Sequence, residues 1–471
     1  MKTLKTDILV IGGGSGGLSV AAGAVQMGAR VVLLEGHKMG GDCLNYGCVP
    51  SKALLAVAAT AYGHSAGADM GILPMVPKSD YAKAKDFVAK VVAEIEPHDS
   101  VKRFEGLGVQ VIQEFGHFIS PTEVKAGETV ITARRIVVAT GSGPFVPPIP
   151  GLANVPFYTN ENIFNLRTKP DHLLVIGGGP VGMEMAQAHS RLGSAVTVIE
   201  GQKAFGKDDP ETASIVLQKL RDEGICVVED AFAENISGMA GDITVETSKG
   251  KFKGTHLLLA VGRKVNIEKL KLDAASIVHH RGGIKVDASL RTSNRRVYAI
   301  GDVAGGLQFT HVAGYHAGII IRSILFGLPS KAKVNHVPWA TYTEPELAQV
   351  GLTELQAQSK FGARLEVVRF DFAGSDRAIA TGKTNGLIKV MIVKGRPVGA
   401  SIAGAGAGEL IGLWAMAIAN NLKMSAIAAT VLPYPSMGEI NKRIAGAYFS
   451  PKLFKSILVK RVVAFVQRFV S

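Results

Sequence analysis

The run Asp7-Ile-Leu-Val-Ile-Gly-Gly-Gly-Ser-Gly-Gly17 decides the fold of this chain. Its first half is a short apolar run that predicts a buried strand, and the Ala-rich stretch from Leu18 to Met27 predicts a helix. Between them stands a Gly-x-Gly-x-x-Gly pattern formed by Gly12, Gly14 and Gly17. Glycines at this spacing let the backbone turn tightly and meet a pyrophosphate at the N-terminus of the helix. The run therefore predicts a strand–turn–helix unit that holds a dinucleotide.

The strand that follows this helix ends in an acid. Residues 31–34 form the strand, and Glu35 stands where a carboxylate can accept hydrogen bonds from ribose hydroxyls. The whole pattern recurs from Leu173, with the glycines Gly177, Gly179 and Gly182 and the terminal acid Glu200. Two copies predict two doubly wound α/β modules, each with a dinucleotide at the carboxyl ends of its strands.

The second acid bears on the choice of nicotinamide cofactor. A carboxylate at Glu200 accepts from a free ribose 2′-hydroxyl and repels a 2′-phosphate. Lys203, three residues further on, softens that preference. We therefore expect NAD(H) to be favoured over NADP(H).

The bulk composition fits a globular protein of several domains. With 471 residues, 47% of them hydrophobic and 19% charged, the chain suits about three domains and is not of disordered composition. The proline-rich stretch 144–156 is predicted to link the two modules, and alternation at 387–393 and 397–402 predicts an antiparallel hairpin in a third region. The formal net charge of +13 permits nucleic-acid binding, but the sequence has no nucleic-acid motif, so we expect no such partner.

The chain has three cysteines, Cys43, Cys48 and Cys226. No signal peptide precedes the first strand and no apolar run reaches the length of a membrane span, which predicts a cytoplasmic protein, where structural disulfides are rare. In Gly-Gly-Asp-Cys43-Leu-Asn-Tyr-Gly-Cys48-Val-Pro-Ser-Lys52, a helical segment would bring two sulfurs into bonding range. The flanking glycines favour a redox pair over two core cysteines. No metal site is expected, because no second pair of soft ligands lies nearby, and Cys226 is expected in the core.

Several further stretches are similar to the class I pyridine nucleotide-disulfide oxidoreductases, the family of dihydrolipoamide dehydrogenase, glutathione reductase and mercuric reductase. Val138-Ala-Thr140-Gly141 and Tyr298-Ala-Ile-Gly301-Asp302 resemble its flavin-contacting turns. Leu259-Ala-Val-Gly262-Arg263 resembles the turn that leads back from its NAD domain. Tyr342-Thr-Glu-Pro-Glu-Leu and Gly404-Ala-Gly-Ala-Gly-Glu409 resemble its dimerisation domain. The likeness runs from residue 5 to about residue 447.

The resemblance implies an α/β fold with two Rossmann-like dinucleotide-binding domains and an α+β C-terminal dimerisation domain, assembled as a homodimer. It implies a discontinuous FAD-binding domain at 1–149 and 272–334 and an NAD(H)-binding domain at 150–271. The dimerisation domain follows at 335–447, and a basic amphipathic C-terminal helix at 448–471.

The resemblance also implies site residues. Cys48 is the sulfur that faces the flavin, Cys43 is the sulfur that attacks substrate, and Lys52 and Glu184 form an ion pair near the flavin. The positions expected to contact FAD are Gly12, Gly14, Gly17, Glu35, Lys52, Gly116, Thr140, Gly141, Asp302 and Ala313. The positions expected to contact NAD(H) or to lead back from its domain are Gly177, Gly179, Gly182, Glu200 and Gly262.

One position departs from the family. Most members carry His-Pro-Thr-x-x-Glu near the C-terminus, whereas this chain has Tyr434-Pro-Ser-Met-Gly-Glu439. Imidazole exchanges protons readily at neutral pH, and a phenol with a pKa near 10 does not. Mercuric reductase also carries tyrosine there, but this chain lacks that enzyme's C-terminal vicinal cysteines. We expect Tyr434 and Glu439 to belong to a catalytic site completed across the dimer, and the acceptor to be non-standard.

The stretch from Ser450 predicts an amphipathic helix. One face holds the apolar residues Phe454, Leu458, Val462, Phe465, Val466 and Phe469, although Lys455 interrupts it. Lys460, Arg461, Gln467 and Arg468 lie on or near the other face. The stretch has no acid. Such a helix suits the surface of an anionic membrane, which predicts peripheral contact through residues 450–471 at the inner face. Packing on the dimer or on a partner is the alternative.

The sequence thus predicts an enzyme that passes electrons from NADH through FAD and a Cys43–Cys48 disulfide to an unidentified small-molecule or metal-ion acceptor. Three alternatives stay open. The chain could be a dihydrolipoamide dehydrogenase, a membrane-surface NADH:quinone oxidoreductase with an incidental disulfide, or a non-catalytic flavoprotein component of a complex.

Overall fold

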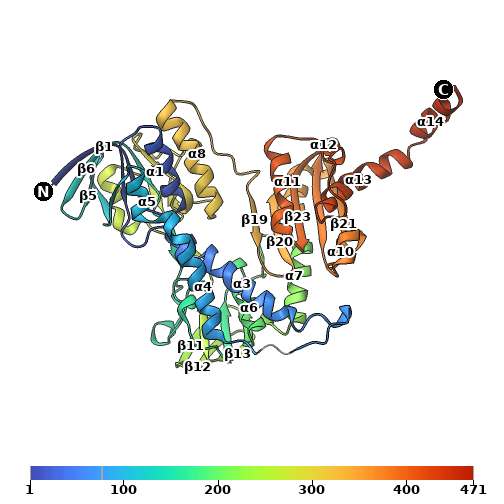
Figure 1. Cartoon of the computed structure of the whole chain (residues 1–471), viewed down its shortest axis with the longest axis horizontal. Helices are drawn as coiled ribbons and strands as arrows, with labels where there is room; N and C mark the ends of the chain where they lie inside the picture. Colours follow the sequence, from blue (N-terminus) through green and yellow to red (C-terminus); the bar gives the residue numbers. More distant parts are fainter. Residues whose placement is uncertain (1, 76–77, 470–471) are drawn as a thin grey trace. The chain divides into compact units, whose positions relative to one another are not determined.

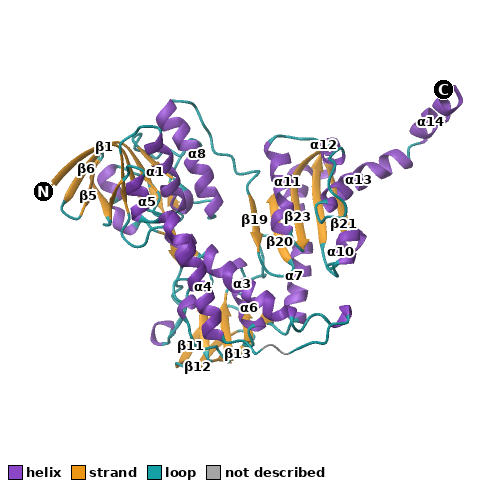
Figure 2. Cartoon of the chain, in the orientation of Figure 1, coloured by secondary structure: helices purple, strands orange, loops and turns teal. Residues whose placement is uncertain are grey.

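The structure, a computed structural model, describes residues 2–75 and 78–469. The chain, shown in Figures 1 and 2, divides into two compact units. The first unit contains residues 1–201 and 226–333, and the second contains residues 202–225 and 334–471. The division into three domains and a C-terminal helix, expected from the sequence, stays a prediction.

A seven-stranded mixed sheet forms the first half of the first unit. Its strands run in the order β3 (Gln110–Ile112), β2 (Val31–Leu34), β1 (Lys2–Ile11), β6 (Thr129–Val138), β5 (Glu123–Ala126) and β4 (Gly116–Ser120), with β18 (Val297–Ala299) beside the second half of β6. The helices of this half are α1 (Ser15–Gln26), α2 (Gly41–Asn45), α3 (Cys48–Gly63), α4 (Tyr81–Ile95), α5 (Val101–Gly106) and α8 (Thr310–Phe326).

Strand β1 shows why the opening run is continuously apolar. Ile8 and Val10 join the core that α1 and α8 cover, while Leu9 and Ile11 join a separate core on the other face of the sheet. A strand buried on both faces needs apolar side chains at every position. The strand begins earlier than the apolar run, because its polar first half pairs with β6.

A second parallel sheet carries the second glycine turn. Its order is β10 (Cys226–Val228), β9 (Ala195–Ile199), β8 (His172–Ile176) and β14 (His256–Leu259), and helix α6 (Pro180–Arg191) follows β8. A three-stranded antiparallel sheet accompanies it, formed by β11 (Ala233–Met239), β12 (Asp242–Thr247) and β13 (Gly250–Gly254). The prediction that Cys226 lies in the core is wrong. Cys226 is exposed, because it is the first residue of the edge strand β10.

Two short antiparallel ribbons complete the first unit. Strand β7 (Ser142–Pro144) pairs with β15 (Arg263–Val265), which brings the exit from the first sheet beside the return from the second. Strand β16 (His279–His280) pairs with β17 (Gly283–Ile284). The stretch 144–156, predicted as a linker, begins at the last residue of β7 and contains a single turn of 3₁₀ helix.

The second unit is built on a five-stranded antiparallel sheet. Its order is β19 (Pro338–Thr341), β20 (Glu346–Gly351), β23 (Arg396–Gly404), β22 (Leu387–Val393) and β21 (Leu365–Asp371), so the predicted hairpin of β22 and β23 is confirmed. Helices α11 (Ala407–Ala419), α12 (Met424–Ala428) and α13 (Glu439–Phe454) pack with the apolar face of the sheet around the buried Trp414. The other helices are α7 (Pro210–Asp222), α9 (Glu354–Phe361), α10 (Asp376–Ala380) and α14 (Ile457–Phe469).

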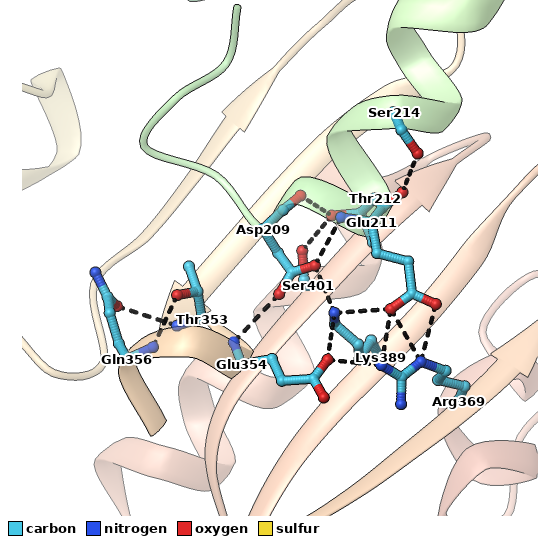
Figure 3. Close-up of polar contacts among 10 residues, drawn as sticks. All are labelled: Asp209, Glu211, Thr212, Ser214, Thr353, Glu354, Gln356, Arg369, Lys389 and Ser401. Carbon is cyan, nitrogen blue, oxygen red and sulfur yellow. Dashed lines mark hydrogen bonds and ion pairs between the residues drawn. The ribbon is translucent and has the colours of Figure 1, made fainter. Parts of the chain in front are cut away.

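A buried ion cluster holds α7 on the sheet of the second unit (Figure 3). The Lys389 ammonium, 3% exposed, lies 2.6 Å from Asp209, 2.8 Å from Glu211 and 2.7 Å from Glu354. Arg369 contacts the same two glutamates, and the Thr212 hydroxyl lies 2.6 Å from that of Ser401. These contacts explain why segment 202–225 groups with the second unit, although it follows β9 in the chain.

The C-terminal stretch differs from expectation in its boundary. Helix α13 continues through residue 448 to Phe454, and a separate helix, α14, then covers Ile457–Phe469. Among the described residues, no helix is both long enough and apolar enough to cross a membrane.

Candidate active site

The two glycine turns have the same geometry. Gly12 and Gly177 have φ of 111° and 112°, and a Cβ on either would lie 2.4 Å from a carbonyl oxygen of a neighbouring strand end. Only glycine adopts such a backbone without strain. In contrast, a Cβ at Gly14 would meet nothing nearer than 3.8 Å, and one at Gly179 nothing within 4 Å. Open space therefore lies at the N-termini of α1 and α6, where backbone N–H groups can receive a pyrophosphate.

The two acids are held in matching positions. Glu35 accepts a hydrogen bond from the Gly13 N–H at 2.6 Å, and Glu200 accepts one from the Gly178 N–H at 2.6 Å. Each carboxylate thus lies at the mouth of its glycine turn, at the carboxyl end of the second strand. The residues present fit two dinucleotides, one at each turn.

The other predicted flavin positions gather around the ribbon of β7 and β15. The Thr140 hydroxyl donates to the Asn266 carbonyl at 2.8 Å, and Gly141 has a φ of 66° with open space at its Cβ position. The Asp302 carboxylate accepts from Ser142 at 2.5 Å. Gly262, with a φ of 121°, also faces open space. These turns therefore meet in the first unit, although they lie far apart in the sequence.

Two predicted positions have a packing role. A Cβ on Gly116 would lie 2.5 Å from Leu34 and 3.1 Å from Val124, so glycine is required for the strand to fit. Ala313, buried in α8, lies where Cβ atoms on Gly16 and Gly301 would meet it at 3.2 and 3.0 Å. Contact of Gly116 and Ala313 with the flavin stays a prediction.

The cysteines come from two helices. Cys43 lies in α2, the chain breaks from helical geometry at Tyr46 and Gly47, and Cys48 is the first residue of α3. The expectation of one continuous helical segment is wrong, because Gly47 has a φ of −120° and a ψ of −111°. Both cysteines are free thiols in the structure, and the Cys48 sulfur lies 3.4 Å from the hydroxyl of Thr310.

The two thiols differ in acidity. A hydrogen bond from Cys43, a contact with Thr310 and the charge of Lys52 together lower the pKa of Cys48 to about 6. The same pairing with Cys48, together with burial, raises the pKa of Cys43 well above its ordinary value. Cys48 also lies at the N-terminus of α3, where the helix dipole stabilises a thiolate. At neutral pH the reduced pair is therefore a Cys48 thiolate beside a protonated Cys43 thiol.

The ion pair implied by the resemblance is present. The Lys52 ammonium donates to the Glu184 carboxylate at 2.7 Å, and the Glu184 side chain is only 4% exposed. Lys52 is one helical turn after Cys48, since both lie in α3. The charge of Lys52 is thus fixed beside the cysteine whose pKa it lowers.

A polar network behind the cysteines was missed by the sequence reasoning. The Arg263 guanidinium lies 3.0 Å from Asp42 and 3.6 Å from Asp302, and it donates to the Ser142 hydroxyl at 2.7 Å. Asn160 donates to Asp42 at 3.0 Å. Asp42 directly precedes Cys43, and its pKa is raised by burial, against the opposing effect of Arg263. The signal in the sequence was an acid beside a cysteine and an arginine directly after Gly262.

A cavity of about 390 Å³ opens beside Cys43. Its lining includes Cys43 and Thr310, the hydroxyl residue Ser19 of α1, and the charged residues Asp99 and Arg103. Burial raises the pKa of Asp99. Cys43 is among the residues that line this cavity, whereas Cys48 is not.

Tyr434 and Glu439 lie in the second unit. The Tyr434 side chain is 68% exposed, and its hydroxyl donates to the Asp376 carboxylate at 2.9 Å. This bond raises the pKa of Tyr434 above its ordinary value. Glu439 is the first residue of α13. The phenol is therefore neutral at physiological pH, and its hydroxyl proton is engaged in the hydrogen bond to Asp376.

Two dinucleotide turns, a dithiol and an ion pair in one unit define a two-dinucleotide redox enzyme. The pyridine nucleotide-disulphide oxidoreductase family model matches residues 6–317, and the model of that family's dimerisation domain matches residues 337–444. The chain belongs to the pyridine nucleotide-disulphide oxidoreductase family. Members use FAD and NAD(P)H, so this chain is a flavoprotein oxidoreductase, and the matched dimerisation domain supports a homodimer.

Known relatives cover nearly the whole chain. Mercuric reductase of Bacillus cereus is 33% identical over 92% of this chain and 70% of that enzyme. Dihydrolipoyl dehydrogenase of Bacillus subtilis is 31% identical over 94% of this chain and 96% of that enzyme. The structure of RclA, an HOCl-induced flavoprotein disulfide reductase from Escherichia coli, has a TM-score of 0.84 and 29% identity, over 93% of this chain and 99% of that one. Structures of RclA as a Cu(II) complex are also similar. Among the described residues, no group of three or more potential metal ligands is present.

Proposed function

We propose that this enzyme uses NADH to reduce the Cys43–Cys48 pair and that the pair reduces a thiolate-binding metal ion or a small organic acceptor. The reduced pair is the observation that carries the proposal. A Cys48 thiolate with a pKa of about 6 lies beside a protonated Cys43 thiol that lines a cavity. One thiol is thus held ready for electron exchange, and the other faces an acceptor.

Each cofactor has its own residues in this scheme. Gly12, Gly14, Gly17 and Glu35 would hold FAD, and the corresponding second set, Gly177, Gly179, Gly182 and Glu200, would hold NADH. When bound, FAD supplies the ability to take hydride from a nicotinamide and to return an electron pair to a disulfide. The chain's own residues tune the sulfurs, because Lys52, fixed by Glu184, lowers the pKa of Cys48.

The electron balance needs no further reductant. The hydride of NADH, an electron pair and a proton, converts the disulfide to one thiol and one thiolate and leaves NAD⁺. The reduced pair then gives two electrons, either to one two-electron acceptor such as Hg(II) or a quinone or to two Cu(II) ions, and the disulfide forms again with release of the thiol proton. Glu200 supports NADH over NADPH, because a carboxylate at that position repels a 2′-phosphate.

The residue at position 434 argues against dihydrolipoamide. Oxidation of a dithiol substrate needs a base, and the Tyr434 phenol is neutral and bonded to Asp376. Reduction of a thiolate-bound metal ion needs no such base. Similarity to mercuric reductases, and to a reductase solved as a Cu(II) complex, supports this choice. We propose that Tyr434 and Glu439 complete the site of the partner subunit without acting as a base.

An anaerobic experiment tests the proposal. The FAD-loaded protein is reduced with one equivalent of NADH, alkylated with iodoacetamide and mapped by mass spectrometry. Labels on Cys43 and Cys48 should require NADH, and Cys226→Ser should give the same result, since Cys226 lies elsewhere on the surface. The reduced enzyme is then mixed with Hg(II), Cu(II), a quinone, lipoamide and glutathione disulfide. Reoxidation by the metal ions at least tenfold faster than by the disulfides is expected, and the reverse order would overturn the choice of acceptor.

A quinone reductase at a membrane surface is the second candidate. The exposed basic helix α14 is the observation that favours it. In that case the disulfide is incidental, so quinone reduction should survive Cys43→Ala. If Cys43→Ala loses both quinone reduction and metal-ion reduction, the quinone reductase with an incidental disulfide is ruled out and the dithiol proposal is supported.

A further inference from the structure

Among residues 2–75 and 78–469, no element packs on helix α14 closely enough to bury any of its residues. None of its residues is buried, and its apolar side chains are widely open to solvent. Leu458 is 71% exposed, Phe465 61% and Phe469 65%. Aromatic and aliphatic side chains gathered on one surface helix mark a binding surface, because scattered apolar residues are common but contiguous ones are not.

The helix is amphipathic, although Ile457 and Ala464 lie on its basic side. At 100° per residue, one side carries the apolar residues Leu458, Val459, Val462, Val463, Phe465, Val466 and Phe469. The opposite side carries Lys460, Arg461, Gln467 and Arg468. An apolar face with aromatic side chains opposite a basic face is the pattern of a helix that lies in a lipid interface.

Helix α13 connects α14 to the rest of the second unit, and its ion pair does not involve the basic residues of α14. Lys452, near the end of α13, forms an ion pair with Glu366 of β21, and Tyr448 donates to the same carboxylate at 3.1 Å. Residues 440–471 contain no Asp or Glu. Lys455, Lys460, Arg461 and Arg468 have no acidic partner among residues 2–75 and 78–469. Four cations therefore remain for an external anion.

These observations favour one occupant. We propose that α14 docks on the surface of a membrane that carries anionic lipids. The helix is about 20 Å long at 1.5 Å per residue, too short to span a bilayer but long enough to lie on one. A second copy of this chain is a poor partner for the basic face, because each copy carries a net charge of +13. The family's dimerisation model ends at residue 444, so α14 lies outside it.

Vesicle binding by the full-length, FAD-loaded protein tests the proposal. Vesicles of phosphatidylcholine with about one third phosphatidylglycerol should bind the protein at low salt, and pure phosphatidylcholine vesicles should bind it much less. Removal of residues 456–471 should abolish binding. Lys460→Gln with Arg461→Gln should weaken partitioning roughly fivefold per charge, and salt should weaken it for the wild type.

A reporter and matched controls separate this proposal from its rivals. Phe465→Trp should show blue-shifted fluorescence on anionic vesicles, and Lys460→Trp, on the opposite face, should not. Leu355→Glu, which changes an equally exposed apolar residue of α9, and Lys331→Gln with Lys333→Gln should keep binding. NADH oxidation in solution should be unchanged in the truncated protein. Vesicle binding that survives truncation, or a tail-dependent change of oligomeric state without vesicle binding, would overturn the proposal.

Discussion

The Lys52 ammonium lies 2.7 Å from the Glu184 carboxylate, so one ion pair joins helix α3, which begins at Cys48, to helix α6, which begins at the second glycine turn. The pair couples the sulfur site to the nucleotide-binding module within one unit. The Glu184 side chain is almost fully buried, whereas that of Lys52 is partly exposed. The buried carboxylate therefore holds the more exposed ammonium in place. The charge beside Cys48 is therefore set by a residue 132 positions away in the sequence.

The pKa of Cys48 should rise when its neighbours are replaced, and the size of the rise should depend on which neighbour is replaced. Cys43 has the largest lowering effect on the pKa of Cys48, Thr310 the next and Lys52 a smaller one. We expect Cys43→Ala, Thr310→Val and Lys52→Met to move the pKa of Cys48 upward from about 6 in that decreasing order. The measurement is the pH dependence of iodoacetamide alkylation of the reduced protein.

Conservative variants control this series. Lys52→Arg keeps the charge, so its alkylation profile should stay near that of the wild type. Glu184→Gln should loosen Lys52 and give a profile between those of the wild type and Lys52→Met. A Cys48 pKa that stays near 6 in Cys43→Ala would contradict the assigned hydrogen bond.

The buried cluster at Lys389 should be the most sensitive polar feature of the second unit. Lys389→Met leaves Asp209, which is fully buried, with Glu211 and Glu354 and without their shared cation. Breaking a buried pair from one side typically costs about 3–5 kcal/mol. We expect a lower melting temperature and faster amide hydrogen exchange across residues 202–225.

Two comparisons sharpen the Lys389 test. Lys383→Met removes an exposed partner of Glu344 and should cost less than about 1 kcal/mol. Arg369 holds the pKa of Glu211 at about 2, with help from Lys389. Because a lowered acid pKa stabilises the fold only above its unfolded value, this contribution is present above about pH 4.5 and is lost as the pH falls toward 2. Arg369→Met should flatten that acid dependence.

The sequence predicted the parts of the structure that local patterns determine. Both glycine turns, the acids Glu35 and Glu200 and the hairpin of β22 and β23 depend on residues close together in the chain, and all are present. The pairing of Lys52 with Glu184 came from resemblance, since nothing local relates two residues in separate modules.

The missed features are those that long-range contacts determine. Thr310 reaches Cys48 only because α8 and α3 meet in space, and Arg263 reaches Asp42 only through the ribbon of β7 and β15. Segment 202–225 follows β9 in the chain, yet contacts of Lys389, Arg369 and Ser401 hold it on another sheet. Cys226 was expected in the core because apolar neighbours surround it, but no pattern showed that β10 is an edge.

The buried lysine of helix α4 should make stability rise with pH. Lys85 is 2% exposed, donates to the Ile163 carbonyl at 3.2 Å and lies against the rings of Tyr81 and Phe164. Burial lowers its pKa to about 7. Between pH 7 and 10.5 the unfolded chain carries a proton that the folded chain lacks, so unfolding becomes harder as the pH rises. Lys85→Met should be more stable than the wild type at pH 7, by up to a few kcal/mol, and the difference should shrink by pH 9.5 in thermal melts.

The hydroxyl of Tyr434 should matter little to turnover, whereas a histidine in its place should matter. The hydroxyl donates to Asp376, which raises its pKa, so it is a neutral phenol across the working range. Tyr434→Phe should therefore leave NADH-dependent metal-ion reduction within about twofold of the wild type.

Tyr434→His introduces a base with a pKa near 6.5, and a positioned base contributes about 10²–10⁴-fold to proton transfer. We expect the variant to gain at least tenfold in dihydrolipoamide oxidation, with a rate that rises with pH through the histidine pKa. Asp376→Asn serves as the matched control, because it removes the carboxylate charge beside the phenol and adds no base. An equal gain in Asp376→Asn, or a large loss of metal-ion reduction in Tyr434→Phe, would show that the tyrosine itself takes part in the reaction.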